Sequence, residues 1–372
     1  KLLANEIEFK PLAPDAILDD LRESGRIGEW SGLFGKALQA IRVERLSKDD
    51  MLSRFKKAKI SKPVEFSNLL DELHQAYVQE LKDQNCIDFD DMIIRTIDVI
   101  RNGTFSSTWD YILVDEFQDI SASRMEFVKA LLEKGNGPSL TVVGDDWQSI
   151  YRFSGGKLEL TTRFDEMVGS YSSTKLQKTF RYNSSIADTA GNFIMENPEQ
   201  YKKYIGTHTK VEESQVYLLD DKIGVKDGLY QRVVEVITKI RERDSGSSIS
   251  VIARYNYLLD DTRQALSNAG LKNKVNFWSY HKSKGLEADY CVLIGFFQGR
   301  SGFPNENKGD AIIEALLPSL DDFPHSEERR LLYVGITRAK KAVYIIADPT
   351  APSEFITELL APKYDINTYY RC

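Results

Sequence analysis

Five short apolar runs, separated by helical patterns, are the feature that most limits how this chain can fold. The runs are four or five residues long and lie at 111–114, 140–143, 249–253, 290–294 and 343–347. Between most of them the apolar residues recur at helical spacing, as in 123–134 and 230–243. Strands that alternate with helices in this way form parallel sheets covered on both faces. The pattern predicts an α/β fold with parallel sheets.

The first 85 residues lack this alternation. They are rich in charged residues, and their apolar residues recur at helical spacing, as in 69–81, so only helices and loops are expected there. A chain of 372 residues exceeds what one core usually serves, and two or three domains are expected. The polar stretch GSYSSTK at 169–175 is the best boundary between two α/β halves.

Composition indicates an ordinary soluble globular protein. Hydrophobic residues make up 42% and charged residues 28%, and no apolar run is long enough to span a membrane. The three cysteines (Cys86, Cys291 and Cys372) are far apart and odd in number. This disfavours a disulfide framework and suggests a reducing cytosol.

Charge alone argues mildly against a nucleic-acid partner, because the net charge is −7. Charge is local, however, and residues 54–62 hold five basic side chains and no acidic one. On pattern alone a solvated helix face explains this stretch better than a binding site.

The segment YILVDEFQDI, at 111–120, places acids at the end of an apolar strand. Asp115 and Glu116 follow the run directly, and a third carboxylate follows at Asp119. We expect the strand to be buried, and a carboxylate against an apolar core is costly unless a cation pairs with it.

The next strand also ends in polar residues, Asp145 and Gln148. The helix between the two strands predicts a right-handed crossover that leaves them parallel, so their carboxyl ends share one rim, where ligands bind. Acids there suit a Mg²⁺ ion that holds phosphate oxygens, with a second carboxylate free to activate water. Alternatively, the acids after the first strand simply favour a helix N-terminus.

Further polar clusters follow along the chain. Phe180 and Arg181 come after a strand-like run, a basic turn spans 281–289, and the amphipathic helix at 327–341 carries Arg338. Arginines that reach across a cleft stabilise a transferring phosphoryl group, an effect of roughly 10³–10⁵ in rate. Any one of them alone is more often a surface or structural residue.

Five segments, in their order along the chain, resemble motifs II to VI of superfamily 1 DNA helicases of the UvrD/Rep type. Within this family the resemblance is strongest to the helicase IV branch. The segments are VDEFQD (114–119), GDDWQSIYRFSG (144–155), TFRYN (179–183), HKSKGLEAD (281–289) and EERRLLYVGITRAKK (327–341), with further similarity at 86–93 and 303–330. The resemblance implies two RecA-like domains that clamp ATP: an incomplete first one at 86–173 and a second at 174–372, after a helical subdomain at 1–85.

The resemblance also implies roles for site residues. Asp115 would hold Mg²⁺, and Glu116 would activate the attacking water. Gln148 would sense the γ-phosphate, which Arg181 and Arg338 would reach from the second domain. The remaining nucleotide-binding candidates are Phe180 against the adenine, Glu287 toward the ribose, Gly285 and Asp145.

For DNA, the resemblance points to Tyr151 and Phe153. Aromatic rings that stack on successive bases bind single strands without sequence preference, at roughly 1–3 kcal/mol per base. Core packing is the alternative for these rings. The other DNA-binding candidates are Ser279, His281 and, in the basic stretch, Lys56 and Lys57.

The chain departs from the family pattern in motif III and after motif IV. Ser154 stands where the family has arginine, and Trp147 replaces an acid, so the role of Trp147 stays open between DNA contact and packing. Only about 100 residues separate Arg181 from His281, so the family's large mobile insert is absent or reduced.

The largest departure is the phosphate-binding loop. No G-x-x-x-x-G-K-[ST] occurs in the chain, and the segments at 34–38 and 155–159 lack its spacing. We expect that a segment before Lys1 carries the loop and that residues 1–85 are the rest of a helical subdomain inside the first RecA-like domain. The chain as given should then hydrolyse ATP poorly or not at all.

These features lead to a functional hypothesis: an ATP- and Mg²⁺-dependent helicase or translocase on single-stranded DNA and single-strand/duplex junctions, 3′→5′ by resemblance. We expect a cytoplasmic, nucleoid-associated monomer with repair or replication partners. The alternative is a remodelling factor that acts on another machine such as RNA polymerase. A helicase–nuclease ranks last, because no nuclease signature follows residue 348.

Overall fold

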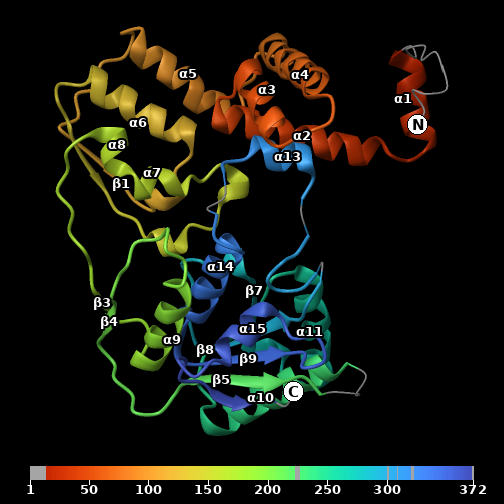
Figure 1. The fold of residues 1–372 in the computed structure, drawn as a ribbon, viewed down its shortest axis with the longest axis vertical. Helices are drawn as coiled ribbons and strands as arrows, with labels where there is room; N and C mark the ends of the chain where they lie inside the picture. Colours follow the sequence, from red (N-terminus) through yellow and green to blue (C-terminus); the bar gives the residue numbers. More distant parts are fainter. Residues whose placement is uncertain (1–13, 223–226, 300, 308, 320–321, 371–372) are drawn as a thin grey trace. The chain divides into compact units, whose positions relative to one another are not determined.

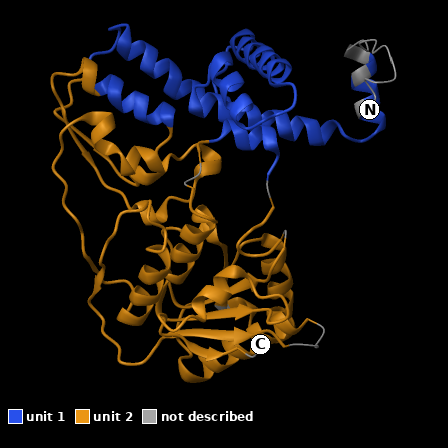
Figure 2. Cartoon of the chain, in the orientation of Figure 1, with its two compact units in different colours: residues 1–106, 122–131, 309–317 blue, residues 107–121, 132–308, 318–372 orange. Residues whose placement is uncertain are grey.

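The computed structural model describes residues 14–222, 227–299, 301–307, 309–319 and 322–370. Lys1, Cys372 and parts of the 303–330 stretch lie outside these ranges. The chain divides into two compact units (Figure 2), of which unit 1 comprises residues 1–106, 122–131 and 309–317, and unit 2 comprises 107–121, 132–308 and 318–372. The predicted division into two RecA-like domains stays a prediction.

Unit 1 is built from helices (Figure 1). They are α1 (Pro14–Glu23), α2 (Ile27–Glu44), α3 (Lys48–Lys57), α4 (Pro63–Asp83), α5 (Phe89–Arg101), most of α6 (Ala122–Lys134) and α13 (Ala311–Leu316). Helices α2, α3, α4 and α13 enclose a core that contains Met51, Phe55 and Leu70. Over the described part of residues 1–85, the prediction of helix and loop is confirmed.

A buried arginine joins two helices of unit 1. Arg42, on α2, is 3% exposed and pairs with Asp88 at 2.9 Å and with Asp91 at 2.5 Å. Asp88 is also the N-cap of α5, where its side chain accepts a hydrogen bond from the Asp91 N–H. Burial alone would lower the pKa of Arg42, but the two carboxylates offset it and raise the pKa. Arg42 is therefore the buried cation that the two carboxylates share.

Unit 2 contains a two-stranded sheet of β1 (Tyr111–Val114) and β2 (Ser139–Val142). The strands are parallel, with Tyr111 opposite Ser139, as the predicted crossover requires. The prediction that β1 is buried is wrong, because Tyr111 is 74% and Leu113 76% exposed. Among the described residues this sheet has only two strands. Successive side chains of a strand point to opposite faces of the sheet, so packing against one face leaves the side chains of the other face in solvent.

The larger sheet of unit 2 has the strand order β10-β5-β9-β8-β6-β7, and all its neighbours are parallel. Its strands are β5 (Val216–Asp220), β6 (Ile249–Ala253), β7 (Val275–Ser279), β8 (Ala288–Phe296), β9 (Ala339–Ala347) and β10 (Asn367–Tyr369). The sequence predicted β6, β8 and β9. It did not predict β7, β10 or β5, although β5 (VYLLD) is also apolar. A separate pair joins β3 (Lys178–Thr179) to β4 (Gly206–Thr207).

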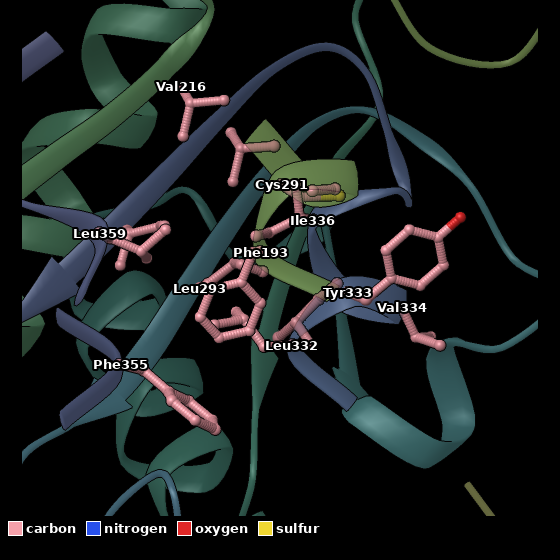
Figure 3. Close-up of a cluster of buried hydrophobic side chains, with 14 of the residues drawn as sticks. Phe193, Val216, Cys291, Leu293, Leu332, Tyr333, Val334, Ile336, Phe355 and Leu359 are labelled. Carbon is pink, nitrogen blue, oxygen red and sulfur yellow. The ribbon is translucent and has the colours of Figure 1, made fainter. Parts of the chain in front are cut away.

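Helices cover both faces of the larger sheet. Cys291 and Leu293 face the core with α9 (Ser184–Ile194), α14 (Ser326–Ile336) and α15 (Glu354–Leu359), which Figure 3 shows. The alternate residues, Val292 and Ile294, face the core with α10 (Gly228–Arg243) and α11 (Asn256–Asn268). The α/β fold with parallel sheets is therefore confirmed. In the described ranges, no helix is long and apolar enough to cross a membrane.

Helix α14 approaches α12 (Tyr280–Ser283) too closely for a side chain at one position. A Cβ added at Gly335 would overlap the ring of Tyr280, which is fully buried. Glycine is thus required there for packing, and the close contact holds the turn before β8 against the helix that carries Arg338 at its end.

Candidate functional site

Asp115 and Glu116 leave the end of β1 in an unusual backbone conformation. Glu116 has φ +49°, in the left-handed region that non-glycine residues rarely adopt. Its N–H donates to Asp115 Oδ1 at 2.8 Å, and both side chains are exposed. Such strain costs about 1–3 kcal/mol and is concentrated at functional sites. The conformation directs two neighbouring carboxylates into solvent at the strand end.

Gln118 links the ends of the two strands. It is 1% exposed, its Nε2 donates to Glu116 Oε2 at 2.5 Å, and its Oε1 accepts from the Asp145 N–H at 2.8 Å. A Cβ at Gly144 would lie 2.8 Å from this Oε1, so the bridge requires glycine there. Sequence reasoning missed Gln118; its only signal was an amide inside the acid-rich segment.

Lys284, in the turn before β8, is a cation that lies against the acids that follow β1. Its side chain is 8% exposed and pairs with Asp119, and its Nζ lies 3.4 Å from Glu116 Oε2. The same ammonium donates to the Gln148 carbonyl at 3.0 Å and lies 5.2 Å from the ring centre of Tyr151. Lys284 therefore joins the acid cluster to the segment that carries Gln148 and Tyr151.

The donor set is compatible with Mg²⁺ held through a bound phosphate. Across the part of the chain that the structure describes, no three His, Cys, Asp or Glu side chains gather as metal ligands. Mg²⁺, however, is often held by one or two carboxylates while phosphate oxygens and water complete its shell. The exposed Asp115 carboxylate is of this type, and the assignment of Mg²⁺ to it stays a prediction.

A cavity of about 500 Å³ collects most of the predicted nucleotide-binding residues. It is lined by Asp145, Gln148, Leu176, Lys178, Thr179, Phe180, Arg181, Tyr182, Ile205, Glu287, Tyr333, Thr337 and Arg338. Six of these were candidates from the sequence. Asp115, Glu116 and Gly285 lie outside this lining, and Gly285 has φ +79° in the turn before β8.

Two arginines give the cavity a positive wall. Arg338 is 1% exposed, and its Nη2 lies 3.5 Å from Gln148 Oε1. Burial, and then the charge of Arg181, lowers the pKa of Arg338 to about 10, so it stays charged near neutral pH. Arg181 lies 3.4 Å from Glu287, which also pairs with Lys340 at 2.5 Å. A cationic cavity of this kind favours an anion.

The aromatic residue of the cavity is open to solvent. Phe180 is 72% exposed and lies beside His208, with ring centres 5.1 Å apart and an interplanar angle of 31°. The Lys178 ammonium lies 5.4 Å from the centre of the same ring. An exposed ring at a cavity wall can stack on a planar ligand.

Three aromatic rings, those of Tyr151, Phe153 and His281, gather outside the lining of the cavity. Phe153 is 56% exposed and lies 5.3 Å from His281, while Tyr151 donates its hydroxyl proton to the His281 carbonyl at 3.1 Å. Burial, and then the charge of Arg254, lowers the pKa of His281 to about 4, so the ring is neutral at pH 7. Ser279 accepts a hydrogen bond from the Lys282 N–H and caps the short helix that carries His281.

The remaining candidates lie elsewhere. Lys56 and Lys57 are exposed in the last turn of α3, in unit 1, and their contact with DNA stays a prediction. Trp147 is 1% exposed, and its Nε1 donates to the Tyr201 carbonyl at 3.0 Å. Its ring meets Tyr333 edge to face at 5.3 Å. Of the two roles left open for Trp147, this environment favours packing.

Comparison with known proteins finds that the chain is similar to DNA helicases. Residues 16–169 match the model of the UvrD/REP helicase N-terminal domain. The chain is 38% identical to DNA helicase IV of Escherichia coli over 288 residues, which is 77% of this chain and 41% of that protein. It is 35% identical to the ATP-dependent DNA helicase Rep of Escherichia coli and 30% identical to the ATP-dependent DNA helicase PcrA of Leuconostoc citreum. These two matches cover 34% and 43% of this chain, and 19% and 22% of the relatives. The chain thus spans less than half the length of these relatives.

Proposed function

We propose that the chain is the ATP-hydrolysing, DNA-contacting part of a DNA helicase, because residues 16–169 match the UvrD/REP helicase N-terminal domain and the chain is 38% identical to DNA helicase IV of Escherichia coli. The observation that carries the proposal is the cavity in which Gln148, Arg181 and Arg338 meet beside the exposed ring of Phe180. A cavity lined by two guanidinium groups and an exposed aromatic ring suits a nucleoside triphosphate.

In this proposal the chain's own residues orient the phosphates and the water. The buried Arg338 and the half-exposed Arg181 neutralise charge on the transferring phosphoryl group. Glu116 takes the proton of the attacking water, and Gln118 keeps its carboxylate in place through the 2.5 Å hydrogen bond. A Mg²⁺ ion at Asp115, when bound, would neutralise the phosphate oxygens.

Single-stranded DNA is the proposed second ligand. Phe153 and Tyr151 are aromatic, Phe153 is exposed, and both follow Gln148 within five residues. Lys284 contacts the Gln148 carbonyl and lies over the Tyr151 ring. A phosphate-dependent shift of Gln148 or Lys284 therefore reaches the rings on which bases would stack. We extend the proposal to strand junctions, to 3′→5′ movement, and to action at the nucleoid as a monomer with repair or replication partners.

ATP turnover depends on a phosphate-binding loop whose motif does not occur in the sequence. We therefore propose that this chain alone binds nucleotide and DNA but turns ATP over negligibly. The decisive measurement uses the complete product of the gene, with ATP hydrolysis measured with and without single-stranded DNA.

The key variant is Glu116→Gln, with Glu133→Gln as its control, since Glu133 is exposed on α6. We expect DNA to stimulate hydrolysis and Glu116→Gln to lower kcat by about 10²–10⁴, the usual contribution of a general base, while the control stays unchanged. If the parent protein binds ATP and single-stranded DNA but hydrolyses ATP negligibly, the motor proposal is refuted and the remodelling factor is favoured.

A further inference from the structure

A segment that no motif includes lies against the residues of the cavity. Residues 197–207, here named the strap, connect α9 to β4 and contact the short 3-10 turn at Asp146–Gln148. Gln200 Nε2 donates to the Asp146 carbonyl at 3.1 Å, and the Tyr201 N–H donates to Asp146 Oδ2 at 2.9 Å. The strap also accepts the indole hydrogen bond of Trp147 through the Tyr201 carbonyl.

Lys203 is the charged residue of the strap that faces this turn. Its Nζ lies 2.5 Å from Asp145 Oδ1, pairs with Asp146, and is 5.0 Å from the ring centre of Trp147. Asp146 is 1% exposed, so it carries a desolvation cost that a cation must offset. Burial alone would lower the pKa of Lys203, but the two carboxylates raise it, and the lysine stays charged.

Asp145 contacts both Lys203 and Gln148 and so links the two residues. Asp145 Oδ2 accepts a hydrogen bond from Gln148 Nε2 at 2.8 Å, and Gln148 Oε1 in turn lies 3.5 Å from Arg338 Nη2. An ionised carboxylate only accepts hydrogen bonds, so it selects the nitrogen end of the amide. The oxygen end is then left to face the arginine. Lys203, 2.5 Å from Asp145 Oδ1, holds the Asp145 carboxylate in place for this selection.

The other end of the strap lines the cavity itself. Ile205 lines it, and β4 pairs with β3 so that Gly206 lies opposite Lys178. Phe180 and Arg181 follow β3 directly. The strap thus connects the turn that holds Gln148 to the strand that holds the exposed ring and the second arginine.

We propose that Lys203 is a positioning residue of the nucleotide cavity, which through Asp145 orients the Gln148 amide toward Arg338 and the terminal phosphate of a bound nucleoside triphosphate. This inference rests on the proposed function. It assigns to Lys203 an effect on the phosphoryl-transfer step, because Gln148 and Arg338 act on the terminal phosphate, whereas Phe180 serves the base.

The test compares Lys203→Met with Lys203→Arg in the complete gene product, with Lys202→Met as the matched control, because Lys202 is the exposed neighbour. The readouts are kcat and KM for ATP in the presence of single-stranded DNA, and the thermal unfolding midpoint. For Lys203→Met we expect kcat to fall about 10- to 100-fold, the equivalent of one charge-assisted hydrogen bond, with KM within about 2-fold. Lys203→Arg should restore most of kcat, since it returns the charge.

A second pair of variants keeps the test valid if Lys203→Met folds poorly. Asp145→Asn retains an oxygen that can accept from Gln148 but removes the charge that Lys203 holds. If Lys203 acts through Asp145, adding Lys203→Met to Asp145→Asn should lower kcat by much less than it does in the parent.

The outcomes separate the inference from the proposed function. A fall in thermal stability with kcat unchanged, additive effects in the double variant, or an equal loss in the Lys202→Met control overturns the positioning role. A parent without DNA-stimulated hydrolysis refutes the proposed function itself, and the positioning role is overturned with it.

Discussion

Replacing Trp147 tests whether this residue packs the core of unit 2 or contacts DNA. Its side chain is 1% exposed, and its indole N–H donates to the Tyr201 carbonyl at 3.0 Å. Trp147→Phe leaves this carbonyl without its donor, which costs about 1–3 kcal/mol when the group stays buried. Trp147→Ala also opens a cavity and removes the edge-to-face contact with Tyr333, for a total of about 3–5 kcal/mol.

Urea unfolding followed by circular dichroism measures both losses as shifts of the transition midpoint. The chain has two compact units, so the transition that moves should be the one that belongs to unit 2. Trp109→Phe is the control, because Trp109 lies in the same unit and is 52% exposed. We expect that control to change the free energy of unfolding by less than about 0.5 kcal/mol.

The packing argument is refuted by the opposite pattern. If Trp147→Phe leaves the unfolding midpoint unchanged and weakens single-stranded DNA binding several-fold, the indole contacts DNA. Trp147 is a core residue if Trp147→Ala loses more stability than Trp147→Phe, and if DNA binding by each variant falls only as much as its fraction of folded protein falls.

Three further predictions concern stability and are measured by urea unfolding. The pKa of His281 is lowered from 6.5 to about 4, so the unfolded chain binds a proton that the folded chain does not. The contribution of His281 to the free energy of unfolding should therefore fall by about 3 kcal/mol as the pH drops from 6.5 through 4. It is measured as the difference between the parent and His281→Asn at each pH, because Asp221, whose pKa is raised to about 6, titrates in the same range with the opposite sign. Arg42→Met removes the buried partner that Asp88 and Asp91 share and should cost about 3–5 kcal/mol. Arg95→Met removes only the half-exposed partner of Asp91 and should cost less than about 1 kcal/mol. Gly335→Ala should lower the free energy of unfolding by about 1–3 kcal/mol, because the added methyl group overpacks the contact with Tyr280. Gly191→Ala is the control: its methyl group enters open space on α9 and should raise the free energy of unfolding by about 0.5–1 kcal/mol. Equal effects of the two variants would contradict the close packing of α14.

Much of the fold was predictable because its signals are local. The apolar runs at β6, β8 and β9 are central strands of a parallel sheet and lack the alternation of half-exposed strands. The edge strands β7 and β10 carry polar residues or are very short, so their patterns did not indicate strands. The burial of β1 was mispredicted because an apolar run reveals what a strand can bury, and not which neighbours cover it.

The candidate site was likewise predictable only in part from the sequence. The residue types at the strand ends were visible in the sequence, and the parallel crossover places them on one rim. The contacts among them were not visible. Lys284 meets Asp119 across 165 residues, and Lys203 meets Asp145 across 58 residues. Each of these pairs forms only after separate elements have packed.

The sequence by itself determined the class of fold, the parallel direction of the strands and the chemistry available at their ends. These follow from periodicity and residue type within a few turns of chain. Only the tertiary structure decided which cation neutralises which carboxylate, which way the Gln148 amide points, and that Trp147 faces the core. A charge or hydrogen bond acts over a few ångströms in space, and the partner that comes within that distance is set by the packing of distant segments.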